Sequence, residues 1–237
     1  MTKTGIISQV RMTSTRLPGK VLLPVQNQPL LKYHTDRLRQ SGFPVLLATT
    51  INQTDDVIAD FAKSENLAFY RGDENNVLSR YYQTALANQL DVIVRVTSDC
   101  PLVDGELVGK AIRQYLQNAN DNIYLSNALM RTYPRGFDFE IFSFKLLKEA
   151  FENADTNFQL EHVTPYIKEH AQTEHIVYPE AASNFRITVD TPEDFELIKK
   201  LIEEHQADTL NHQEIITLLQ NHPDLVKINA HIEQKKT

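Results

Sequence analysis

Residues 5–20 read GIISQVRMTSTRLPGK, a short apolar run that passes directly into a loop rich in cations and hydroxyl groups. An apolar run of this length without polar alternation is typical of a buried parallel strand. The loop carries the planar donor forks of Arg11 and Arg16 and the compact charge of Lys20, which together suit phosphate groups. Open α/β sheets bind ligands at the carboxyl ends of their strands. We therefore expect a phosphate site here, with a solvated surface loop as the alternative.

The loop matches neither of the two common phosphate motifs. The spacing G-x-x-x-x-G-K-[ST] of P-loop ATPases is absent, and so is the G-x-G-x-x-G of dinucleotide-binding proteins. An ATPase and a Rossmann dehydrogenase are therefore less well supported than another kind of nucleotide-binding enzyme.

Beyond this loop, short runs rich in branched residues alternate with longer segments whose apolar residues recur at helical spacing. This alternation predicts an α/β fold with a mostly parallel sheet. The run 137–142 alternates apolar and polar residues and predicts a strand with one exposed side, possible in a small antiparallel excursion. The expected strands are 5–10, 43–49, 67–70, 91–97, 123–126, 137–142, 175–178 and 186–189. The expected helices are 29–40, 55–64, 76–88, 105–117, 144–153, 192–205 and 213–220.

The bulk properties exclude several classes of protein. The 237 residues suit one domain, and the net charge of -7 disfavours nucleic-acid binding, which needs a broad basic face. We expect a cytoplasmic protein, because the sequence has neither a signal peptide nor an apolar stretch long enough to cross a membrane. The single cysteine, Cys100, excludes an internal disulfide and a cysteine-based zinc site.

Two aspartates follow buried strands in the predicted sheet. Asp99 comes after the run 91–97 and Asp190 after the run 186–189. In a parallel sheet both would emerge at the edge that carries the cationic loop, where two carboxylates can bind Mg²⁺. The alternative for each is to cap a helix. This is weaker for Asp190, because Thr191 already holds the best cap position.

These residues resemble the cytidylyltransferase family that includes the CMP-sugar-acid synthetases, most closely the branch named after the spore coat polysaccharide biosynthesis protein SpsF. The resemblance extends to about residue 196. It rests on the motifs QVRMTSTRLPGKVL (9–22), YRGDE (70–74), NVLSRYY (76–82), SDCPL (98–102), YPRGFD (133–138), EHVTPY (161–166) and VDTPED (189–194).

The resemblance implies a three-layer Rossmann-like nucleotidyltransferase fold, and roles for individual side chains. Arg16, Lys20, Asp99 and Asp190 would be catalytic, with the two aspartates as Mg²⁺ ligands. The nucleotide-binding residues would be Arg11, Ser14, Arg16, Lys20, Arg71, Asp73 and Arg80. The acceptor-binding residues would be Tyr133, Arg135, Asp138, Glu161 and His162. Residues 123–185 would form the acceptor side and a possible dimerisation region of a single domain, 1–237.

The expected reaction transfers the cytidylyl group of CTP to the anomeric hydroxyl of a 2-keto-3-deoxy sugar acid, with release of pyrophosphate, for surface polysaccharide biosynthesis. The resemblance also implies a homodimer. The alternatives are a nucleotidyltransferase for another sugar or sugar phosphate, a glycosyltransferase of the same architecture and a non-catalytic nucleotide-binding homologue. The chain departs from the family in having Ser98 where the family often has glycine, and Arg135 where it often has aspartate.

Overall fold

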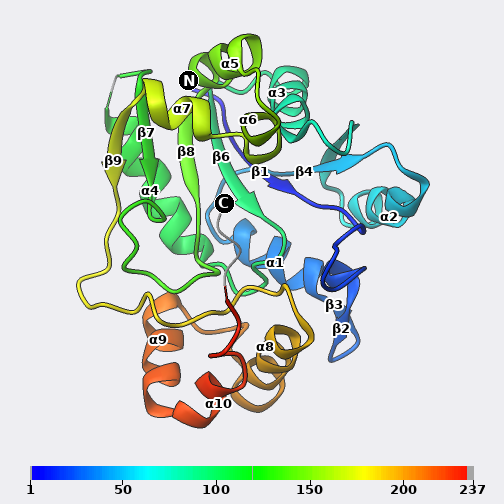
Figure 1. Ribbon diagram of the computed structural model, residues 1–237, viewed down its shortest axis with the longest axis vertical. Coiled ribbons are helices and arrows are strands. Elements are labelled where there is room, and N and C mark those ends of the chain that lie inside the picture. The colour runs from blue at the N-terminus through cyan, green and yellow to red at the C-terminus, as the bar shows by residue number, and fades with distance from the viewer. Residues whose placement is uncertain (1, 119, 234–237) are drawn as a thin grey trace.

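A mixed seven-stranded sheet forms the centre of the molecule. The computed structural model describes residues 2–118 and 120–233. The strands of the sheet are β1 (Thr4–Gln9), β4 (Val45–Thr50), β5 (Ala68–Gly72), β6 (Val92–Thr97), β7 (Ile123–Ser126), β8 (Glu140–Ser143) and β9 (Gln172–His175). Their order is β5-β4-β1-β6-β8-β7-β9 (Figure 1). β5, β4, β1 and β6 are mutually parallel, whereas β8 runs antiparallel to both β6 and β7. A separate hairpin joins β2 (Pro24–Val25) and β3 (Gln28–Pro29).

Helices cover both faces of the sheet, which gives the predicted three-layer α/β fold. One face packs against α1 (Leu30–Arg39), α2 (Asp56–Ser64) and α4 (Gly105–Gln117). The other packs against α3 (Val77–Ala87), α5 (Phe144–Asn153), α6 (Asn157–His162) and α7 (Pro165–His170). The helices α8 (Pro192–His205), α9 (His212–Asn221) and α10 (Pro223–Lys227) gather at one end of the sheet, at the bottom of Figure 1.

Local sequence signals explain several helix boundaries. Thr191 caps α8 with Pro192 at its first position and Asp194 completing a capping box, as the sequence predicts. His34 is fully buried on α1. Its ring lies between the hydroxyl of Ser8 on β1 and the carbonyl of Cys100. This pair of contacts fixes α1 against the turn that carries Asp99.

Three expected strands differ from the structure. The run 186–189 is not a strand of the sheet and forms one isolated parallel bridge, Arg135 to Arg186. The strand expected at 137–142 begins only at Glu140, and it is buried rather than exposed on one side because β6 and β7 flank it and helices cover it. The strand expected at 175–178 lies three residues earlier, as β9. The alternation of apolar and polar residues does not predict these differences, because they depend on which strand each segment pairs with.

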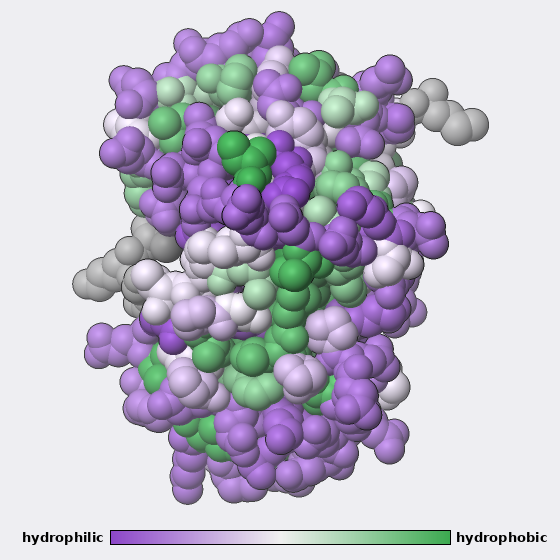
Figure 2. Space-filling view, turned by 90° about the vertical axis from the view of Figure 1, so that its right-hand side faces the viewer, coloured by the Kyte–Doolittle hydropathy of each residue, from purple (hydrophilic) through white to green (hydrophobic). Residues whose placement is uncertain are grey.

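The face of the molecule shown in Figure 2 is largely polar. In Figure 2, hydrophilic side chains cover most of the face on the right-hand side of Figure 1, and apolar side chains gather mainly across its middle. Within residues 2–118 and 120–233, no helix combines the length and the apolar character that crossing a membrane requires.

Candidate active site

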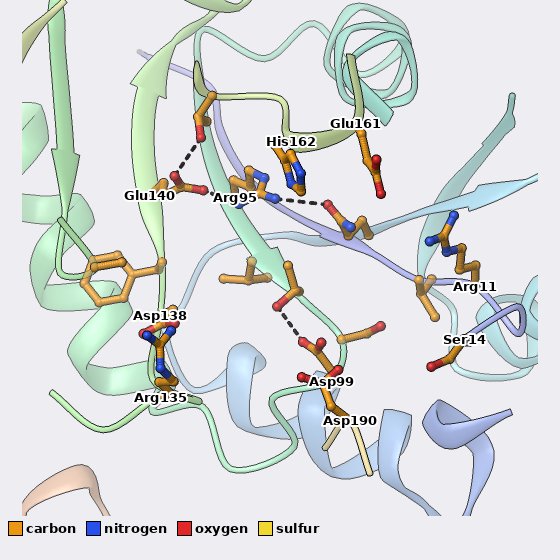
Figure 3. Close-up of a pocket in the computed structure, with 18 of the residues that line it drawn as sticks. Arg11, Ser14, Arg95, Asp99, Arg135, Asp138, Glu140, Glu161, His162 and Asp190 are labelled. Atoms are coloured by element: carbon orange, nitrogen blue, oxygen red, sulfur yellow. Dashed lines mark hydrogen bonds and ion pairs between the residues drawn. The ribbon is translucent and has the colours of Figure 1, made fainter. Parts of the chain in front are cut away.

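The carboxyl ends of β1 and β6 open into a cleft of about 520 Å³. β1 lies between β4 and β6, so the chain order reverses at β1, which is the point where open α/β sheets bind ligands. Figure 3 shows side chains from several separate segments facing this space. The segments that line it include residues 9–21, 95–99, 128–140 and 158–168, together with Asp190.

Lys20 holds the two predicted metal ligands together. Its Nζ lies 3.1 Å from Oδ2 of Asp99 and 2.8 Å from Oδ1 of Asp190. Burial alone would raise the pKa of Asp99, but the charge of Lys20 and a hydrogen bond from Thr97 lower it to about 2. Burial likewise opposes the charge on Lys20, and the two aspartates outweigh it and raise the pKa of the ammonium. Both carboxylates therefore face one cation.

Asp190 reaches Asp99 through backbone contacts rather than through a neighbouring strand. The N–H of Val189 donates to the carbonyl of Asp99 at 2.7 Å. The buried carboxylate of Asp194 then accepts the N–H of Asp190 at 2.9 Å. Two arginines also hold Asp190, since Nη2 of Arg16 and Nη2 of Arg186 each lie 2.9 Å from its Oδ2. The backbone contacts thus fix the position of Asp190, and the two arginines neutralise its carboxylate.

The donor set of this pair fits Mg²⁺. Among the described residues, no cluster of three or more His, Cys, Asp or Glu side chains could enclose a metal. Mg²⁺ does not need one, because it commonly takes one or two carboxylates and keeps the rest of its octahedron for water and substrate phosphates. The ammonium of Lys20 already marks a cation position between Asp99 and Asp190. The site therefore suits a divalent cation that binds together with a phosphate chain.

The predicted phosphate loop follows β1 and faces the cleft. Arg11, Ser14, Arg16 and Lys20 all line it. The loop is closed by the N–H of Gly19, which donates to the carbonyl of Met12 at 2.9 Å, and Gly19 itself takes the left-handed φ of 70°. The N–H of Met12 donates to the buried Asp55 at 2.8 Å, which ties the loop to the end of β4.

The three other predicted nucleotide residues support the cleft more than they enter it. Arg71 does not line the cleft, because its guanidinium donates to the carbonyls of Thr50 and Asn52 and pairs with Asp56. Asp73 accepts two backbone N–H groups at the start of α3 and lines a smaller adjoining pocket.

Arg80 is 1% exposed and lies at the edge of the cleft. Its Nη1 donates to the carbonyls of Asp73 and Glu74 at 2.5 Å and 2.8 Å. The Glu74 carboxylate in turn binds the hydroxyl of Thr13 and lies 3.6 Å from Arg11. Arg80 therefore holds the β5–α3 loop against the phosphate loop.

The predicted acceptor residues before β8 divide into two groups. Arg135 and Asp138 line the cleft on the β8 side in Figure 3, across from Asp99 and Asp190. Asp138 forms a two-pronged contact with Arg131, with distances of 2.7 Å and 3.0 Å. Tyr133 does not line the cleft, because its ring is 4% exposed and packs against Tyr178 and His212.

Glu161 and His162 line the opposite wall at the turn between α6 and α7. Val163 is fully buried with φ 69° and ψ -54°, and the N–H of Thr164 donates across it to the carbonyl of His162 at 2.8 Å. Such a tight γ-turn is strained, above all for a β-branched residue. Burial, with the nearby cations Arg95 and Lys168, lowers the pKa of His162, so its ring is neutral near pH 7.

Sequence reasoning missed the buried charges at this end of the cleft. Glu140 on β8 accepts contacts from Arg95, Tyr124 and Thr164, and Lys168 lies 3.2 Å away. Burial alone would raise the pKa of Glu140, but the positive charge of Arg95 helps to lower it to about 2. The available signal was Arg95 itself, a lone charge inside the apolar run of β6. Its partner could not be identified without knowing that β8 inserts beside β6.

Comparisons with known proteins identify the family of this chain. The family described as Cytidylyltransferase matches residues 5–227. The spore coat polysaccharide biosynthesis protein SpsF of Bacillus subtilis is 35% identical over 92% of this chain and 94% of its own length. A 3-deoxy-manno-octulosonate cytidylyltransferase of Solibacter usitatus is 32% identical over 46% of this chain and 42% of its own. The solved structure of a cytidylyltransferase from Leptospira borgpetersenii superposes with a TM-score of 0.88 and 31% identity, and the match covers 100% of this chain and 99% of that one.

Proposed function

This chain belongs to the cytidylyltransferase family, and we propose that it activates a sugar acid of the 2-keto-3-deoxy type with CTP. The products are a CMP-sugar for surface polysaccharide biosynthesis and pyrophosphate. Because the reaction consumes CTP, we also propose a cytoplasmic location for the enzyme. By the family resemblance, residues 123–185 of the single domain carry the acceptor side and the contact of a homodimer.

The observation that carries this proposal is the charge of the cleft. Among the described residues that line it, eight are lysine or arginine and five are aspartate or glutamate, although the whole chain has a net charge of -7. A local excess of positive charge in an acidic protein concentrates anions at that place. The triphosphate and a carboxylate acceptor are both anionic, so the cleft suits the two substrates of the proposed reaction together.

In the proposed reaction the anomeric hydroxyl of the acceptor attacks the α-phosphorus of CTP. One oxygen–phosphorus bond forms, the bond to the β-phosphate oxygen breaks, and the hydroxyl proton leaves to solvent. Arg11 and Ser14 hold the phosphate chain, and Arg16 and Lys20 stabilise the charge that develops on the leaving pyrophosphate. Both cations must turn from Asp190 towards the phosphates to do so.

Asp99 and Asp190 would hold Mg²⁺, which would neutralise the negative charge of the phosphates when bound. Arg71, Asp73 and Arg80 keep the nucleotide side of the cleft in shape through the backbone contacts described above. Asp138, Glu161 and His162 face the acceptor, and Tyr133 supports the loop that carries Arg135. No protein nucleophile is needed, because positioning and charge neutralisation supply the rate.

Pyrophosphate release tests the proposal. The purified protein with Mg²⁺ is offered each nucleoside triphosphate with sialic, legionaminic, pseudaminic and octulosonic acids and with sugar phosphates. Release that requires CTP and a sugar acid is the expected result. Asp99→Asn and Asp190→Asn should each abolish turnover while leaving thermal unfolding close to wild type, and normal activity in both variants would refute the metal assignment.

The same panel, extended by nucleotide sugars, separates the alternatives. A sugar-phosphate nucleotidyltransferase releases pyrophosphate only with a phosphorylated sugar, and a glycosyltransferase releases a nucleotide from a nucleotide sugar. CTP binding without turnover on any acceptor would support a non-catalytic homologue.

A further inference from the structure

Among the residues that the structure describes, Arg135 is the cation of the cleft whose charge has no partner. Of the eight lysine and arginine side chains that line the cleft, seven bind a carboxylate or a backbone carbonyl. For the guanidinium of Arg135, the described residues provide neither an ion pair nor a hydrogen bond. A partly buried arginine without a partner is costly unless a ligand supplies the missing anion.

The surroundings of Arg135 strengthen this need. The carboxylate of Asp138, which interacts electrostatically with Arg135, already accepts hydrogen bonds from both Nη atoms of Arg131. Burial lowers the pKa of Arg135, and the positive charges of Arg131 and Arg186 lower it further, whereas the negative charge of Asp138 opposes them. The cluster of Arg131, Arg135, Asp138 and Arg186 therefore has an excess of positive charge, and Arg135 lines the open cleft (Figure 3).

The backbone of Arg135 is clamped to the segment that leads to Asp190. Its N–H donates to the carbonyl of Phe185 at 3.1 Å, and its carbonyl accepts the N–H of Ile187 at 2.8 Å. The next residue, Gly136, has φ 115°, and a Cβ there would lie 2.8 Å from the backbone of Ile187. Glycine is thus required for this close approach. As a result, the position of Arg135 is fixed relative to the predicted metal ligand three residues beyond Ile187.

That placement matches the chemistry of a 2-keto acid. Its carboxylate is bonded to the same carbon that bears the attacking hydroxyl, so the carboxylate must bind close to the two aspartates. Arginine is suited to this task, because its planar fork matches the two oxygens of a carboxylate. A phosphorylated sugar would also bring an anion, and the experiment must distinguish the two.

We propose that Arg135 binds the acceptor carboxylate and thereby selects a 2-keto acid over a neutral sugar. This inference rests on the proposed cytidylyltransferase activity and names the residue that reads the acid group. It makes Arg135 a specificity-determining residue, at a position where the family often has aspartate.

The test measures binding to protein saturated with Mg²⁺ and a CTP analogue that has a methylene group between the α- and β-phosphorus atoms. Calorimetry follows 3-deoxy-manno-octulosonate, its C1 carboxamide and glucose 1-phosphate with wild type, Arg135→Gln and Arg135→Lys. Arg113→Gln on α4 removes an equal charge outside the cleft as a control. Arg135→Gln should weaken binding of the acid about 10- to 100-fold, as expected for one lost hydrogen-bonded ion pair. The carboxamide should bind wild type and Arg135→Gln equally.

Arg135→Lys should recover part of the affinity, and the affinity for the CTP analogue should stay within about 2-fold in every variant, since Arg135 is proposed to act on the acceptor. The inference is overturned if Arg135→Gln binds the acid as wild type does, if wild type binds acid and carboxamide equally, or if only glucose 1-phosphate binds. Pyrophosphate release by wild type tests the proposed function separately. If wild type turns over a sugar acid while Arg135→Gln binds the acid with unchanged affinity, the proposed function stands and this inference is refuted.

Discussion

Acidification should weaken the fold through His34, which links α1 to the turn that carries Asp99. The ring is fully buried, its Nδ1 donates to the carbonyl of Cys100 at 2.9 Å, and its Nε2 accepts from Ser8 at 2.8 Å. Burial lowers the pKa of His34 from 6.5 to about 4. Between these pH values His34 is protonated in the unfolded chain but not in the folded protein. The free energy of unfolding therefore falls as the pH falls from 6.5 towards 4.

The two pKa values fix the size of this effect. Linkage gives a loss from His34 of about 2 kcal/mol at pH 5 and about 3 kcal/mol at pH 4, relative to pH 7.5. Above pH 6.5 the ring is neutral in both states, and its titration no longer changes stability. A loss of this size is a large fraction of the total stability of an ordinary domain.

Urea unfolding of wild type and His34→Asn between pH 4 and pH 7.5 measures the effect. Asparagine keeps a donor for the Cys100 carbonyl and loses the Ser8 contact, so the variant should be less stable by about 1 to 2 kcal/mol at pH 7.5. Asparagine does not titrate in this pH range. The difference in free energy of unfolding between wild type and variant should therefore close or reverse by pH 5. Other titrating groups are common to both proteins. Two stability curves that stay parallel from pH 6.5 to pH 4 would refute the reasoning.

Two further predictions concern the metal pair and the clamp at Gly136. Lys20→Met removes the ammonium that occupies the space between Asp99 and Asp190, so free Mn²⁺ should bind about 10-fold more tightly in the absence of nucleotide. Electron paramagnetic resonance measures this, with the exposed Lys63→Met as control, and equal affinity in both variants would contradict it. Gly136→Ala should cost about 2 to 4 kcal/mol, because the new Cβ meets the backbone of Ile187 at 2.8 Å. Gly42 also has a positive φ, of 80°, but a Cβ there would meet no atom within 4 Å. Gly42→Ala should therefore cost only about 1 kcal/mol in urea unfolding. Equal losses in the two variants would remove the steric explanation.

The parts that the sequence predicts well are those that depend on neighbours along the chain. The runs that became β1 and β6 are apolar enough to identify buried strands, and the capping box at Thr191 marks the start of α8. The loop that carries Arg16 and Lys20 follows directly from such a strand, so its placement beside Asp99 could be predicted.

The parts that it predicts poorly depend on partners far away in the chain. The sequence predicts Asp190 at the end of a sheet strand, whereas in the structure a backbone hydrogen bond from Val189 to Asp99 holds this segment in place. The pairing of Arg95 with Glu140 requires β8 to run antiparallel between β6 and β7. Arg71 illustrates a different difficulty, because a cation in a family motif does not reveal that backbone carbonyls hold it away from the cleft.

Asn229 supports the turn that carries Asp190, and it is synthesised after all strands of the sheet. Its Nδ2 donates to the carbonyl of Arg186 at 3.0 Å and to Oδ1 of Asp194 at 2.8 Å, and Asp194 holds the N–H of Asp190. Residue 229 leaves the ribosome after every strand of the sheet. A nascent chain can therefore assemble the sheet and the phosphate loop before the turn that presents Asp190 has gained its last support, and the nucleotide site matures late in biosynthesis.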